Sequence, residues 1–176
     1  MEMKKRTIMI FPEFNNMKYI DELRGKYDPL VNKVRPHITL VFPFESAFTK
    51  SEIYEILNCM LCRIKPFEVE VQGLSVQGEW LFLDLAKGKI PLIEIHNILY
   101  ANEFAAYKPD WLKKYMPHIT VGKFNSKKEC ENVYLNEQGF NKIFTSLVNE
   151  VTVEIIGDNE ESIIEIEYPL YSNKHQ

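Results

Sequence analysis

The chain has 176 residues and a net charge of −4, with 45% hydrophobic and 26% charged residues. This composition is typical of a folded globular domain and excludes a mainly disordered chain, and no apolar run is long enough to cross a membrane. The acidic balance also argues against a protein that binds duplex DNA or RNA through many phosphate contacts. It leaves room for one small phosphorylated ligand at a local site.

The first half of the chain predicts strand, helix, strand, helix and strand in that order. Two asparagines at 15–16 can cap the first helix, and the second begins with a capping box of Thr49 and Glu52 and ends before Pro66. Apolar runs and alternation of apolar with polar residues indicate the strands. We expect strands at 6–12, 36–42 and 67–72, and helices at about 16–26 and 50–65.

The second half predicts the same order of elements and adds one strand. A turn at Gln77 and Gly78 leads into its first strand, and Pro91 suits the first turn of a helix. Ser126 and Glu129 form another capping box. We expect strands at 80–85, 117–124, 151–156 and 163–168, and helices at about 91–99 and 126–138.

The middle strand of each half begins with the same four residues. Pro-His-Ile-Thr occurs at 36–39 and again at 117–120, which places the second histidine 81 residues after the first. No linker rich in Gly, Ser or Pro separates the halves, so we expect two related lobes of one unit. The expected single domain spans 1–176, with lobes at about 1–77 and 78–176.

This repeated motif indicates acid–base chemistry. Side chains alternate along a strand, so the His and Thr of each motif share one face. If an approximate two-fold axis relates the lobes, those faces meet across a groove. One imidazole can then act as general base and the other as general acid, while the hydroxyls donate hydrogen bonds to phosphoryl oxygens. Such a site suits cleavage of a phosphodiester, and a strained 2',3'-cyclic phosphate needs no metal ion for it. The four candidate catalytic residues are His37, Thr39, His118 and Thr120.

The two motifs resemble those of the two-histidine (2H) phosphoesterase superfamily, which includes 2'-5' RNA ligase-like (LigT-like) proteins and cyclic nucleotide phosphodiesterases. That family carries His-apolar-Thr/Ser-apolar twice, as this chain does at 37–40 and 118–121, and Phe42 extends the first match. The resemblance implies an α+β, two-lobed, pseudo-symmetric LigT-like fold with mostly antiparallel sheets around a central groove and helices outside. It also implies a cyclic phosphodiesterase, a hydrolase in which the second histidine is the base and the first the acid.

Two further residues are candidates for substrate binding, Lys123 and Tyr115. The RNA ligase-like branch often has arginine five residues after the second histidine, where this chain has Lys123. Alternation alone would place Lys123 on the far face of its strand, and a bulge or strong twist near Gly122 would return it to the groove. Tyr115 and Trp111 precede the second motif and can form a wall for a nucleobase. Phe42, at an odd offset in its strand, is expected in the core.

Other uses of the motifs stay open. Two histidines could hold a metal, but the sequence offers no clear third ligand, so we expect neither a metal nor another cofactor. The groove could bind a nucleotide or RNA end without turnover, or support 2'-5' RNA ligase-type activity. The acidic segment 150–176, with seven acids and one base, could instead dock a basic partner in a complex.

The remaining expectations concern partners and isolated residues. We expect a monomer that acts on a small nucleotide or RNA-end substrate and binds neither duplex DNA nor a membrane. Three cysteines without a signal peptide indicate a reduced, cytoplasmic protein. Cys59 and Cys62 lie in a helical pattern and are expected to be buried thiols, and His96 is expected to be peripheral.

Overall fold

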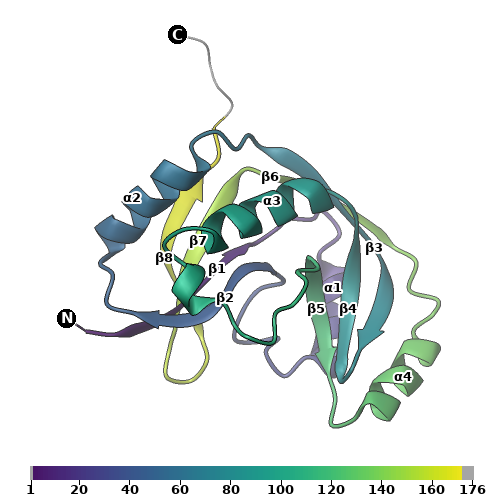
Figure 1. The fold of residues 1–176 in the computed structure, drawn as a ribbon. Coiled ribbons are helices and arrows are strands. Elements are labelled where there is room, and N and C mark those ends of the chain that lie inside the picture. Colours follow the sequence, from purple (N-terminus) through teal and green to yellow (C-terminus); the bar gives the residue numbers. More distant parts are fainter. Residues whose placement is uncertain (1, 172–176) are drawn as a thin grey trace.

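The computed structural model describes residues 2–171, which form two antiparallel four-stranded sheets and four α-helices (Figure 1). The first sheet has the strand order β2-β1-β7-β8 and the second β5-β4-β3-β6. The strands are β1 (Lys4–Ile10), β2 (Ile38–Ser46), β3 (Phe67–Gln77), β4 (Trp80–Lys87), β5 (His118–Lys123), β6 (Ile143–Val148), β7 (Glu150–Ile156) and β8 (Ser162–Pro169). The helices are α1 (Lys18–Tyr27), α2 (Lys50–Leu61), α3 (Lys89–Tyr100) and α4 (Lys127–Asn136). The predicted α+β class with antiparallel sheets is confirmed.

Helices cover one face of each sheet. α2 and α3 pack against the first sheet, whereas α1 and α4 pack against the second. The buried stripe of α2 consists of Ile53, Leu57 and Leu61, and its predicted capping box has both hydrogen bonds in place. The opposite faces of the two sheets carry Thr39 and Thr120, which border a shared cavity. The sheets therefore meet at the two motifs, with the helices outside.

The lobe boundary expected near residue 77 does not separate the two sheets. β3 belongs to the second sheet, and β7 and β8 return to the first. The turn after β3 explains the difference. Gln77 pairs directly with Trp80, and Gly78 has a φ of 60° in the loop between them. A hairpin keeps its two strands side by side in one sheet, so this turn joins β3 to β4 instead of dividing two lobes.

The edge strand β6 was not among the strands expected from the sequence, because it lacks the alternation of apolar and polar residues. Its inward side chains are Phe144, Ser146 and Val148, while Ile143 and Leu147 are 51% and 60% exposed. Because the outward face is as apolar as the inward face, alternation of hydrophobicity does not reveal this strand.

Two expectations about isolated residues are wrong. Cys59 and Cys62 are exposed, because both fall off the buried stripe of α2. His96 is 1% exposed, because α3 buries it against β2, where its Nδ1 lies 2.7 Å from the carbonyl oxygen of Leu40. A histidine next to an apolar stripe is therefore part of the core here.

Strand β2 departs twice from regular pairing with β1, once opposite Thr7, where β2 has two residues against one, and once at Leu40. Thr39 and Val41 pair with consecutive residues of β1, which leaves Leu40 as the extra residue of a β-bulge. Leu40 and Val41 are consequently both fully buried on the helix side. The bulge reverses the alternation beyond it, so Phe42 lines the cavity and is not in the core as expected.

Strand β5 has a bulge at the equivalent position. Thr120 and Gly122 pair with consecutive residues of β4, which leaves Val121 as the extra residue. Lys123 then pairs with Trp80, and its ammonium lies 4.8 Å from the centre of that indole ring. Of the two features that would return Lys123, a bulge or a strong twist, the structure has the bulge, and it turns Lys123 to the same side of β5 as Thr120.

We predict that Gly122→Ala destabilises the protein. A Cβ at this position would lie 3.0 Å from the Cβ of Tyr27 and 3.0 Å from the ring of Phe124, and the Cβ of Tyr27 is fixed to the last residue of α1. Overpacking of this kind costs about 1–3 kcal/mol. Urea unfolding of both proteins measures the change, with Gly139→Ala as control, because a Cβ at Gly139 meets nothing within 4 Å. Equal stability of the Gly122 variant and the wild type would contradict a tightly packed bulge.

Candidate active site

A cavity of about 500 Å³ lies between the two motif strands and the loop before β5. Thr39 borders it from the first motif, and His118 and Thr120 border it from the second. Its apolar wall also contains Leu112 and Met116, and it is largely aromatic, with Phe42, Trp80, Phe82, Trp111 and Tyr115. His37 lies beside this cavity, close enough to His118 for a charge on one ring to disfavour a charge on the other. The structure thus brings both motifs to one place.

Both motif histidines are held in the same way by their own backbone. Nδ1 of His37 lies 2.8 Å from the carbonyl oxygen of Arg35, and Nδ1 of His118 lies 2.7 Å from that of Met116. A carbonyl oxygen can only accept, so each Nδ1 carries a proton and donates it. Each neutral ring therefore has its lone pair on Nε2, which is the nitrogen left for chemistry.

Aromatic side chains fix the planes of these two imidazoles. Phe82 stacks on His118 with ring centres 3.6 Å apart and planes 23° apart. Phe11 contacts His37 edge to face, with centres 6.2 Å apart. Both contacts exclude water, and burial is the main cause that lowers the pKa of each histidine below its ordinary value.

A carboxylate accompanies His118. Asp84 pairs with His118 across β4 and β5, and its charge raises the pKa of that histidine against the lowering effect of burial. The hydroxyl of Ser75 donates a 2.7 Å hydrogen bond to Asp84 and fixes the carboxylate. Asp84 is absent from the candidates drawn from the sequence. The sequence did contain a sign of its role: Asp84 is the one acid in β4, and alternation places it on the same face as Trp80 and Phe82.

A buried ion pair organises the loop that leads to His37. Arg24 is 1% exposed, and its Nε donates to the carboxylate of Asp28 at 2.7 Å. The same guanidinium donates to the carbonyl oxygens of Leu30 at 3.3 Å and Val34 at 2.8 Å. Its positive charge lowers the pKa of His37, and Asp28 raises it by a smaller amount. Sequence patterns did not single out Arg24, because it lies on a helix whose other charges are exposed.

The two candidates for substrate binding occupy different places. The ring of Tyr115 lines the cavity, while its hydroxyl donates a 2.7 Å hydrogen bond to the carbonyl oxygen of Thr39. Lys123 lies farther along β5, over the indole of Trp80, which borders the same cavity. Tyr115 therefore lines the cavity itself, whereas Lys123 lies next to one of the residues that line it.

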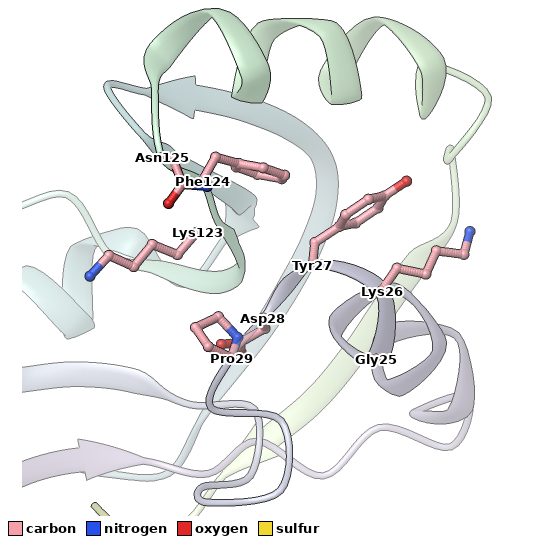
Figure 2. A pocket seen from close by; sticks show the side chains of 8 residues that line it. All are labelled: Gly25, Lys26, Tyr27, Asp28, Pro29, Lys123, Phe124 and Asn125. Atoms are coloured by element: carbon pink, nitrogen blue, oxygen red, sulfur yellow. The ribbon is translucent and has the colours of Figure 1, made fainter.

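A second cavity, of about 410 Å³, adjoins Lys123 (Figure 2). It is lined by residues 25–29 and 123–125, and its lining contains no histidine. Lys26 and Lys123 extend away from it in opposite directions in Figure 2, and Lys26 is paired with Glu137 at 3.1 Å. The two ammonium groups do not converge, so we place the candidate chemistry in the cavity between the motifs.

Neither a metal cluster nor a membrane helix is found in the part of the chain that the structure describes. Within residues 2–171, no group of three or more His, Cys, Asp or Glu side chains is arranged to hold a metal ion. No helix in that range is both long enough and apolar enough to span a membrane.

The amino-acid sequence matches a known protein family and several relatives. The model of the 2'-5' RNA ligase superfamily matches residues 12–157. Relatives named "Putative phosphoesterase" include one from Geobacillus thermodenitrificans, 27% identical over 74% of this chain and 75% of the relative. Another, from Oceanobacillus iheyensis, is 26% identical over 78% of this chain and 82% of the relative.

Solved structures share the fold at lower identity. Apo E. coli LigT has a TM-score of 0.64 and 19% identity, covering 98% of this chain and all of its own. E. coli LigT complexed with 3'-AMP has a TM-score of 0.62 and 18% identity, covering 97% of this chain and all of its own. These similarities confirm the expected LigT-like fold.

We predict that both motif histidines titrate below 6.5, the ordinary pKa of the side chain, and that Asp84→Asn lowers the pKa of His118 further. The variant removes the negative charge that favours the imidazolium, whereas Asp84 has no such effect on His37. NMR titration of the ring protons measures both values. Ser75→Ala is the matched control, because it removes the hydrogen bond to Asp84 and keeps the charge. An unchanged His118 pKa in the Asn variant would contradict the pairing.

Proposed function

Because the chain belongs to the 2'-5' RNA ligase superfamily, we propose that it is a metal-independent phosphoesterase that opens the 2',3'-cyclic phosphate of a nucleotide or RNA end. The observation that carries the proposal is the matched pair of Nδ1 bonds, which leaves Nε2 of His37 and of His118 free. A displacement at phosphorus needs one proton acceptor and one proton donor, and two such rings supply both.

In the proposed reaction, Nε2 of His118 takes a proton from water as the water oxygen forms a bond to phosphorus. The bond from phosphorus to one ribose oxygen breaks at the same time. His37, protonated at Nε2, gives its proton to that leaving oxygen. Water is thereby added across one P–O bond, the product is a phosphomonoester, and the proton gained by His118 later returns to His37 through solvent.

The unequal surroundings of the two histidines support this assignment of roles. Asp84 stabilises the imidazolium that forms when His118 accepts a proton. The nearby cation Arg24 favours loss of a proton from His37. If the carboxylate lay beside His37 and the cation beside His118, the same reasoning would make His37 the base and His118 the acid.

The hydroxyls and the cavity wall provide the rest of the proposed site. Thr39 and Thr120 border the cavity and would donate hydrogen bonds to the non-bridging oxygens, where negative charge grows. The aromatic wall, including the ring of Tyr115, suits the flat face of a nucleobase. Lys123 would attract substrate phosphate at the far end of the groove.

We also propose that residues 1–176 act as one domain. His37 precedes a strand of the first sheet and His118 begins a strand of the second, so neither sheet holds both catalytic groups. The monomeric state and the cytoplasmic location stay predictions from the sequence.

We predict that His37→Ala and His118→Ala each lower turnover of a 2',3'-cyclic mononucleotide by about 10²–10⁴-fold, the usual contribution of one general acid or base. Phosphorus NMR of the product measures turnover. EDTA should leave the wild-type rate unchanged, because neither histidine is proposed to act through a metal. Cys59→Ser is the control, since Cys59 is exposed on α2 and does not line the cavity.

The result also separates the alternatives. Retained turnover in either motif variant contradicts the proposed mechanism. Calorimetric binding of the cyclic nucleotide without product would show a binding module instead. A panel that includes RNA ends and 2'-5' linked substrates distinguishes hydrolysis from ligase-type activity.

We predict a bell-shaped dependence of kcat/KM on pH with its maximum below 6.5. The base must be neutral and the acid protonated, so activity falls as pH drops through the pKa of the base and as pH rises through that of the acid. Burial lowers the pKa of both histidines, which moves both limbs to lower pH. A maximum well above neutrality would show that other groups control the reaction.

A further inference from the structure

Two side chains from outside the first sheet donate hydrogen bonds to the backbone of β2 beside the first motif. The hydroxyl of Tyr115 donates to the carbonyl oxygen of Thr39 at 2.7 Å. Nδ1 of His96 lies 2.7 Å from the carbonyl oxygen of Leu40, which can only accept, so this nitrogen donates. We call Tyr115 and His96 the clasp.

The bulge makes these carbonyl groups available. β2 is the outer strand of its sheet, so it has a strand neighbour on one side only. In a regular strand the carbonyls of consecutive residues point to opposite edges. Leu40 has no partner in the ladder, which allows its carbonyl and that of Thr39 to be satisfied by side chains from the same region.

The clasp is rigid because its two rings stack on each other. The rings of Tyr115 and His96 have centres 3.8 Å apart and planes 3° apart. His96 is 1% exposed, and burial lowers its pKa and raises that of Tyr115. The imidazole thus stays neutral and the phenol stays protonated, so both remain hydrogen-bond donors over the working pH range.

The hydrogen bond from Tyr115 to Thr39 connects the two motifs because of where Tyr115 lies in the chain. Tyr115 lies three residues before His118, and its bonding partner Thr39 lies two residues after His37. The two motif strands belong to different sheets and share no ladder of backbone hydrogen bonds. Their separation is therefore set by side-chain contacts, and the bond from Tyr115 joins the segments that carry both motifs.

We propose that Tyr115 is a positioning residue that fixes the first motif relative to the second. This inference rests on the proposed function, in which a phosphate is held between the two motifs. Loss of the hydroxyl lets β2 move away from His118 without removing any group that touches the substrate phosphate. A displacement of this kind at a reacting centre costs about 10²-fold in rate for an ångström.

The test compares Tyr115→Phe with Tyr100→Phe. The hydroxyl of Tyr100 also bonds to the backbone of β2, accepting from the N–H of Phe42 at 2.9 Å, but Tyr100 lies on α3 and not in the segment that leads to His118. We expect Tyr115→Phe to lower kcat about 10–100-fold with KM within about twofold. Tyr100→Phe should leave kcat within about twofold. Both variants lose one hydrogen bond, so thermal unfolding should show similar stability.

A second readout needs no turnover. NMR titration of His37 and His118 in the same variants reports how well the groove excludes water. Tyr115→Phe should move both pKa values upwards toward 6.5, because a looser groove hydrates the rings, and Tyr100→Phe should not. If the wild type cleaves no phosphodiester but these pKa values still move, the proposed function is wrong, whereas the positioning role of Tyr115 is supported.

Two results would overturn the inference. The first is a Tyr115→Phe protein with wild-type kcat and unchanged histidine pKa values. The second is an equal loss of kcat in the two variants, which would mean that any hydrogen bond to β2 matters equally and that the link between the motifs has no special role.

Discussion

Each motif strand carries, next to its motif threonine, a residue that the strand beside it does not pair, and the candidate site depends on that bulge. The extra residues, Leu40 and Val121, each come directly after the motif threonine. Before the bulge, alternation turns histidine and threonine to one side of the strand. After it, the reversed alternation places Phe42 in the cavity wall and Lys123 over Trp80, on the same side of β5 as Thr120. Without these bulges, the side chain five residues after each motif histidine would turn to the opposite face of its strand, and the cavity would lose Phe42 from its aromatic wall.

The two histidines combine similar geometry with different electrostatics. Both rings donate from Nδ1 to a carbonyl oxygen two residues earlier, so the backbone sets the same tautomer twice. Asp84 lies beside one ring and the cation Arg24 lies near the other. A repeated fold with exact charge symmetry would give both rings one proton affinity. In the proposed reaction one ring gains a proton while the other loses it, and the different neighbours favour that exchange.

The sequence predicted what local patterns determine. The motif strands, the capping box at Thr49 and the turn at Gln77 were visible, because each depends on residues close together in the chain. The assignment of strands to sheets was not, because pairing joins segments far apart. The partners of the histidines, Asp84 and Arg24, were missed for the same reason: their role comes from where the fold brings them.

The order of strands has a consequence for how the chain is made. The second sheet, which carries His118, has all its strands once residue 148 has been synthesised. In the first sheet β1 lies between β2 and β7, and Thr7 pairs with Glu154. A nascent chain therefore exposes the unpaired backbone N–H and C=O groups along one edge of β1 until β7 emerges from the ribosome, and during that interval the edge is open to pairing with other chains. The sheet next to His37 is completed last, so a chain cut short before β7 has every strand of the second sheet and an unpaired edge on β1.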